Sequence, residues 1–179
     1  MDALEAIAKR KSVRDYKKDQ ISDKAVAAII AAGQNAPSAG PYHITVVQNR
    51  ELLQHISNLA LEAMKNSGNE FLMSRAALPG YEPLYGAPTL FLLSAPEGPY
   101  SLATTSCAAT SMTIAATALG LGSCYLITPK LAFAADKGLT ARAGIPEGYE
   151  IMCAVAVGYK AGDKFAVERI KKDNVNYVK

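Results

Sequence analysis

The chain has 179 residues, half of them hydrophobic and a fifth charged, which is the composition of an ordinary globular domain and enough length to bury a core. We therefore expect one domain over residues 1–179. The formal net charge of +3 suits a small anionic ligand, but the basic residues are not clustered with aromatic ones, which argues against nucleic-acid binding. The acidic, amphipathic N-terminus has no apolar signal segment, so a cytoplasmic protein is expected.

Hydrophobic periodicity and turn residues predict the elements of the first half of the chain. They are a helix over residues 2–9, a helix over 22–32 that starts at the cap Ser22 and stops at Gly33, a loop over 35–41, a strand over 43–48 and a helix over 51–65. Residues 66–87 are rich in glycine and proline and are predicted to be irregular.

The second half alternates buried strands with helices. Its predicted elements are a strand over residues 88–94, a helix over 102–119, a short strand over 125–127, a helical turn over 132–138, a central strand over 151–157 and a basic, polar tail over 160–179. The resulting order, α-α-β-α-β-α-β-β, is that of an α+β or a mixed α/β fold.

No charged residue occurs between Glu97 and Lys130. A membrane span is one interpretation of such a stretch, but this one is dense in serine and threonine and contains Gly120, Gly122 and Pro129. Small and hydroxylated residues at this density favour a closely packed internal helix, so no membrane association is expected.

The three cysteines, Cys107, Cys124 and Cys153, lie far apart in apolar sequence and are predicted to be buried, reduced thiols. Neither His43 nor His55 has a cysteine or carboxylate at ligand spacing, so no metal site is expected.

Residues 9–14 read KRKSVR and form the strongest local candidate for a ligand site. If this run is extended, side chains alternate, so Arg10, Ser12 and Arg14 share one face while Val13 anchors the other. Two guanidinium groups around a hydroxyl make an anion receptor suited to phosphate. Taken alone, a charge run of this kind is more often a solvated surface than a ligand site.

Four motifs occur in order along the chain. They are RKSVR at residues 10–14, APSAG at 36–40, ALGLGSC at 118–124 and VGY at 157–159. Together they resemble the nitroreductase family of FMN-dependent oxidoreductases, over nearly the whole chain. The resemblance implies a three-layer α+β fold, a mixed and mainly antiparallel sheet flanked by helices, and a homodimer with two FMN sites at its interface. A dimer would bury the uncharged helix over 102–119, although a monomer with that helix at its centre stays possible.

The resemblance also implies a role for individual residues. Arg10 would meet the FMN phosphate, Ser12 would support the phosphate or ribityl chain, and Lys11 would add backbone contacts or charge. Arg14 would lie at the N1–C2 edge of the flavin ring. The loop from the other subunit would supply Pro37, Ser38, Ala39 and Gly40; the backbone of Leu126, Ile127 and Thr128 would face flavin N5; and Arg169 would be a second phosphate ligand.

Two departures from the family pattern stand out. Many members follow the Pro-Ser loop with Asn-x-Gln, whereas here Gly40 runs directly into Pro41, so one flavin contact is missing or comes from elsewhere. The chain is also short for the family, and the substrate wall is reduced to residues 66–87, which predicts an open or mobile pocket.

The implied activity is an NADH- or NADPH-dependent reduction of nitroaromatic, quinone or related small acceptors, by ping-pong hydride transfer through flavin N5. The flavin carries the chemistry, so no catalytic triad is expected. Two alternatives remain open: a non-catalytic flavin-binding or storage module, and a specialised flavin chemistry such as dehalogenation or flavin breakdown.

Overall fold

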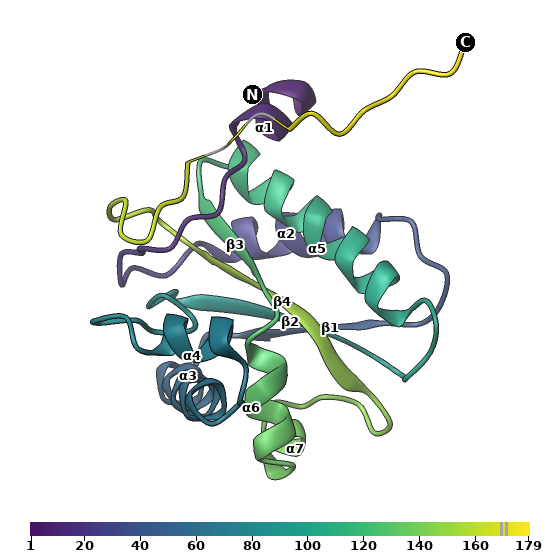
Figure 1. Cartoon of the computed structure of the whole chain (residues 1–179). Coiled ribbons are helices and arrows are strands. Elements are labelled where there is room, and N and C mark those ends of the chain that lie inside the picture. Colours follow the sequence, from purple (N-terminus) through teal and green to yellow (C-terminus); the bar gives the residue numbers. More distant parts are fainter. Residues whose placement is uncertain (169, 171) are drawn as a thin grey trace.

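The computed structural model describes residues 1–168, 170 and 172–179, and this part of the chain contains a four-stranded sheet (Figure 1). The strands are β1 (His43–Val47), β2 (Thr89–Ala95), β3 (Gly122–Leu126) and β4 (Glu150–Gly158). They lie in the order β1-β2-β4-β3, and every neighbouring pair is antiparallel. β2 is buried at each position and β4 at all but its first, as expected for strands covered on both faces.

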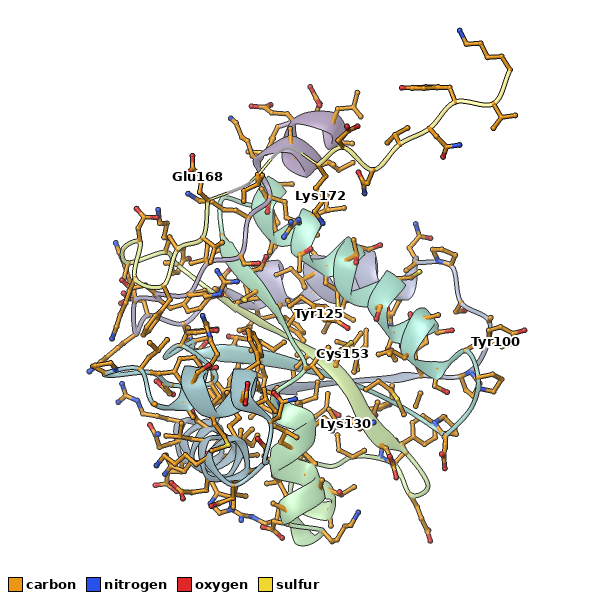
Figure 2. All side chains as sticks on the ribbon, in the orientation of Figure 1. Tyr100, Tyr125, Lys130, Cys153, Glu168 and Lys172 are labelled. Carbon is orange, nitrogen blue, oxygen red and sulfur yellow. The ribbon has the colours of Figure 1, made fainter. Side chains whose placement is uncertain are left out.

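One face of the sheet is covered by α5 (Ser101–Ala118) and α2 (Asp23–Gln34), and α1 (Ala3–Lys9) packs on α5 (Figure 1). Phe91 and Leu93 of β2 point into this layer and meet Met112 of α5. Tyr125 of β3 and Cys153 of β4 face the same way and lie near the centre of the molecule in Figure 2. The tyrosine hydroxyl is 3.0 Å from the Ser106 hydroxyl on α5.

The opposite face is covered by α3 (Arg50–Lys65) and α6 (Pro129–Ala135), with α4 (Glu70–Ala76) beside α3 and α7 (Gly138–Arg142) following α6. Leu90 and Leu92, the alternate residues of β2, pack in this layer with Ile56 of α3 and Phe133 of α6. Alternate side chains of β2 therefore pack into the helical layers on opposite faces of the sheet. The predicted three-layer α+β arrangement is confirmed.

The expected mixed character of the sheet comes from one isolated contact. The N-terminal arm, residues 10–17, forms a parallel bridge from Ser12 to Ser123 of β3, while all pairs between the named strands are antiparallel. The remaining predicted elements are confirmed within a few residues, except for the corrections that follow.

Gly33 does not end its helix, because α2 continues to Gln34. A Cβ on Gly33 would lie 2.9 Å from Cγ of Met112 and 3.2 Å from Cδ1 of Ile44. This glycine is therefore needed for the close approach of α2 to α5, and not for a left-handed stop.

The prediction of an irregular segment over residues 66–87 was wrong for α4. Asn69 caps that helix, accepting a hydrogen bond from the Leu72 amide at 3.1 Å. The predicted short strand over 125–127 begins earlier, at Gly122, and the predicted helical turn over 132–138 is replaced by α6 and α7. For the strand and the helical turn the local signal was real and its boundary was misplaced, whereas α4 was missed altogether.

Of the three cysteines, Cys124 and Cys153 are buried as predicted, but Cys107 is exposed on the outer side of α5. The sequence around Cys107 is uncharged and made of small residues on every side, so it gave no indication of which face was covered within one chain. No helix of the described residues is long and apolar enough to cross a membrane.

Candidate functional site

The N-terminal arm runs beside β3 in the same direction. Besides the Ser12–Ser123 bridge, the Val13 amide donates a 2.9 Å hydrogen bond to the Ser123 carbonyl. Val13 is buried, and a Cβ on Gly122 would lie 2.9 Å from its Cγ1 atom. The arm can lie this close to β3 because position 122 has no side chain.

The arm brings three of the predicted residues to one place, around the buried Cys124 thiol. Burial raises the pKa of Cys124, while the charge of Arg14, a hydrogen bond with the Ser12 side chain and the charge of Arg10 act in the opposite direction. These three residues of the arm therefore all influence one buried thiol. Their role as cofactor ligands stays a prediction.

The parallel direction of the arm sets the order of these groups along β3. Arg10 ends α1, Ser12 lies level with Ser123, and Arg14 lies further toward the end of the strand. Beyond that end lie Ile127, which is exposed, and Thr128, whose Oγ1 atom is buried without a hydrogen-bond partner in the described part of the chain. From Ser123 to the end of the strand at Leu126 the chain rises roughly 10 Å.

Arg14 is held by residues far away in the sequence. Its Nη1 atom donates to the Phe165 carbonyl at 3.2 Å, and its guanidinium carbon is 6.0 Å from the centre of the Tyr85 ring. The tail near Phe165 is itself attached to the arm, since Lys160 and Lys11 both pair with Asp163, at 2.6 and 4.0 Å. A small cavity of about 70 Å³ between arm and tail has room for a few waters and not for a flavin.

Arg75 of α4 is a site residue that sequence reasoning missed. Its Nη2 atom donates to the Tyr85 hydroxyl at 3.1 Å, and its guanidinium carbon lies 5.3 Å from the centre of the Tyr81 ring. Its charge also acts on Cys124. The only sequence signal was a single arginine inside a segment that was predicted to be irregular.

Tyr81, Tyr85 and Phe165 form an aromatic cluster with ring centres 5.8 to 6.1 Å apart. Tyr85 and Phe165 both have left-handed backbones, with φ of 57° and 55°. For residues with a Cβ this conformation costs of order 1–3 kcal/mol and persists only where the surroundings enforce it. Tyr81 and Tyr85 therefore form a packed wall with Phe165 of the tail. The open or mobile pocket expected over residues 66–87 stays a prediction.

The loop at residues 37–40 is exposed and does not join the arm within one chain. The Ala39 amide donates to Thr104 Oγ1 at 3.1 Å, near the start of α5, whereas Ser123 Oγ reaches the Thr113 carbonyl at 3.5 Å. Nine helical residues separate these two attachment points, which is about 14 Å along the axis. Within one chain the loop is therefore attached to α5 well away from the place where Ser123 meets that helix.

Arg169 lies outside the described residues, so its predicted role cannot be placed. The described residues contain no group of three or more His, Cys, Asp and Glu that could hold a metal ion. A larger cleft, of about 530 Å³, lies between α6, α7 and the start of β4, near Lys130 in Figure 2, and includes none of the predicted site residues.

The fold is an α+β sandwich in which the N-terminal arm carries Arg10, Ser12 and Arg14 alongside β3. The model of the Nitroreductase family matches residues 7–159. A relative from Archaeoglobus fulgidus, provisionally named NADH dehydrogenase/NAD(P)H nitroreductase, is 32% identical over 186 residues, covering 96% of this chain and 98% of the relative. The chain belongs to the nitroreductase family.

Solved structures agree with this assignment. A nitroreductase with bound FMN from Desulfitobacterium hafniense superposes with a TM-score of 0.90 at 30% identity. A nitroreductase with bound FMN from Bacteroides fragilis gives a TM-score of 0.84 at 29% identity. Each comparison covers 100% of both chains, so the shared fold includes every element described above.

Proposed function

We propose that this chain is an FMN-dependent oxidoreductase that takes electrons from NADH or NADPH and passes them to a nitroaromatic, a quinone or a related small acceptor. The observation that carries the proposal is the parallel arm, which arranges Arg10, Ser12 and Arg14 in that order along β3. The two FMN-bound nitroreductases and the name of the archaeal relative support the choice of cofactor and donor.

The residues present fit FMN, which has a phosphate at one end and a planar ring at the other. Arg10 and Ser12 would hold the phosphate end, with Lys11 adding charge, because guanidinium and hydroxyl groups suit phosphate. Arg14 would lie by the ring edge, and the unpartnered Oγ1 of Thr128 would gain a polar neighbour at the far end. When bound, FMN supplies the ring nitrogen that accepts hydride from reduced nicotinamide.

Arg14 would tune this chemistry by its charge. Reduction places negative charge on the ring edge, and a fixed cation there favours the reduced form. At ~4 Å and an effective dielectric constant of ~20, the interaction amounts to up to about 4 kcal/mol before solvation costs. The contacts with Tyr85 and the Phe165 carbonyl keep the guanidinium in place.

The proposal includes a homodimer. Leu102, Ala103, Cys107 and Thr110 make an exposed, uncharged face on α5. A second copy on this face would cover it and would bring a loop 37–40 to the arm, which one chain alone does not do. Each site would then combine Arg10, Ser12, Arg14 and residues 126–128 of one subunit with Pro37, Ser38, Ala39 and Gly40 of the other.

Steady-state oxidation of NADH and NADPH by the FMN-loaded protein, with menadione or nitrofurazone as acceptor, tests the activity. We expect turnover that depends on both the donor and the acceptor. Tight FMN binding without turnover would favour a flavin-binding or storage module, and turnover with other flavin substrates alone would favour a specialised chemistry. Either result would contradict the proposal.

A further inference from the structure

The aromatic cluster is surrounded by three cations, of which only Arg14 is assigned to the cofactor. Arg14, Arg75 and Lys164 each approach a ring of the cluster, at 6.0, 5.3 and 5.2 Å from the ring centres. Among the described residues, none of these three cations is held in an ion pair by a carboxylate.

We propose that Arg75, positioned by Tyr85, binds the electron acceptor and selects acceptors in which an aromatic ring carries a carboxylate or a similar anionic group. This inference rests on the proposed function and adds the class of acceptor to it. An arginine has the geometry for the task, because its fork of N–H donors matches a carboxylate.

The position of Arg75 places it beside the ring end of the candidate cofactor site. Arg75 contacts the hydroxyl of Tyr85, and Arg14 lies over the ring of the same tyrosine. Arg75 and Arg14 therefore contact two different parts of the Tyr85 side chain, the hydroxyl and the ring. Arg10, which would hold the phosphate, is at the opposite end of the arm. A group bound by Arg75 would lie next to Arg14 and leave Arg10 to the cofactor.

The surroundings make Arg75 a fixed group instead of a flexible surface cation. Tyr81 and Ala76 are buried with Met64 in a small core of their own, and Tyr85 packs against it. Each of the two tyrosines ends a turn that is closed by a backbone hydrogen bond. The Tyr81 amide donates to the Leu78 carbonyl at 3.0 Å, and the Tyr85 amide donates to the Glu82 carbonyl at 2.9 Å. A preorganised cation beside aromatic faces suits an aromatic anion.

Lys164 supports the same preference for anions without needing direct contact. Its Nζ atom donates to the Gly80 carbonyl at 3.3 Å and lies over the Phe165 ring. The nearby Asp163 is already paired with Lys160 and does not offset this charge. An anionic acceptor would thus approach through a positive field.

Matched acceptors test the proposal directly. 4-Nitrobenzoate and 4-nitrobenzamide have the same ring and nitro group and differ in charge. With FMN-loaded protein, Arg75→Met should raise KM for 4-nitrobenzoate about tenfold or more and change KM for 4-nitrobenzamide less than about twofold, since one charge-assisted contact corresponds to at least a tenfold effect. Arg142→Met, on the exposed end of α7, is the control for lost net charge.

Tyr85→Phe separates positioning from direct binding. It keeps the ring and removes the hydroxyl that accepts from Arg75. We expect a smaller rise in KM for 4-nitrobenzoate than Arg75→Met gives, with no rise for 4-nitrobenzamide. An equal loss with both acceptors in either variant would mean that the residues only maintain the wall, and would overturn the proposal.

Binding of benzoate, which cannot be reduced, gives a readout apart from activity. Titration calorimetry on the oxidised FMN-loaded protein should show benzoate binding about tenfold weaker in Arg75→Met, with FMN affinity unchanged. Weaker FMN binding would make Arg75 a cofactor ligand and overturn the proposal, as would unchanged benzoate binding. If the native protein reduces neither acceptor, the proposed function fails, and benzoate binding alone then decides whether Arg75 recognises aromatic anions.

Discussion

Arg14 donates a hydrogen bond to the Phe165 carbonyl, which lies 151 positions later in the chain, at 3.2 Å. This contact is one of several between the N-terminal arm and the tail. The Lys17 amide donates to the Tyr159 carbonyl at 2.8 Å and the Ala161 amide to the Asp15 carbonyl at 2.9 Å. The two ends of the fold therefore fix the position of the guanidinium that would face the flavin ring.

Replacing Arg10 and replacing Arg14 should change different properties of the bound FMN. Arg10→Ala should weaken FMN retention, because it removes a charge-assisted contact with phosphate that contributes ~1.5–3 kcal/mol, or roughly ten- to a hundredfold in Kd. Fluorescence titration of FMN into the apoprotein measures this change. An FMN affinity equal to that of the native protein would remove Arg10 from the phosphate site.

Arg14→Ala should mainly lower the midpoint potential of the bound FMN. Loss of a cation beside the ring edge destabilises the reduced form, and for a two-electron couple 1.4 kcal/mol corresponds to about 30 mV, so we expect a shift of tens of millivolts. Arg14→Lys, which keeps the charge, should shift the potential less. An unchanged potential in the alanine variant would mean that Arg14 is not at the ring edge.

Gly122→Ala should destabilise the fold by about 1–3 kcal/mol, because the new Cβ would overlap Val13 in a packed core. Urea unfolding measures the loss, and Gly40→Ala, where a Cβ meets nothing within 4 Å, is the control. Combining Gly122→Ala with Val13→Ala should cost less than the sum of the two single changes. Simple additivity would show that the arm does not lie against β3.

The contact between Val13 and Gly122 also shows what the sequence could predict and what it could not. Alternation along residues 10–14 was enough to put Val13 on the opposite face from Arg10, Ser12 and Arg14. It could not identify β3 as the neighbour, because nothing local encodes a bridge between residues 12 and 123. The buried strands β2 and β4 were predicted well, because an uninterrupted run of apolar residues is enough to indicate a strand that is covered on both faces.

The dimer prediction can be tested on α5. Thr110→Glu would place a charge on the exposed, uncharged face and should convert a native dimer to monomers with weaker FMN binding. Asn58→Glu, on the exposed side of α3, should leave the dimer intact. Light scattering after size-exclusion chromatography gives the mass of each species. A native monomer, or a Thr110→Glu protein that stays dimeric, would contradict the proposed interface.

Stability should fall in alkaline solution because of the buried thiols. Burial raises the pKa of Cys124 and of Cys153 above the ordinary value of 9.0. The unfolded chain then loses these protons first, so stability is complete below about pH 9 and falls as the pH rises, by up to about 1.4 kcal/mol per pH unit for each thiol. Urea unfolding of Cys124→Ala should show a shallower pH dependence, while the exposed Cys107→Ala should match the native slope.

Arg75 marks the limit of sequence reasoning at this site. A glycine- and proline-rich segment predicts turns, but the helix that carries Arg75 depends on the Asn69 cap and on the contacts of its residues with Met64. The wall needs a tail residue, Phe165, whose ring meets Tyr81 and Tyr85 from 84 and 80 positions away along the chain. Tertiary packing, and not local propensity, decided the structure of this segment.

The central claim is that this chain binds FMN and that reduced nicotinamide reduces it. The most direct test is the visible absorption spectrum of the purified, FMN-reconstituted protein under anaerobic conditions, before and after addition of NADH or NADPH. We predict a flavin spectrum that stays with the protein through gel filtration and bleaches on addition of at least one donor. A protein that retains no flavin, or a bound flavin that stays oxidised with both donors, would contradict the account.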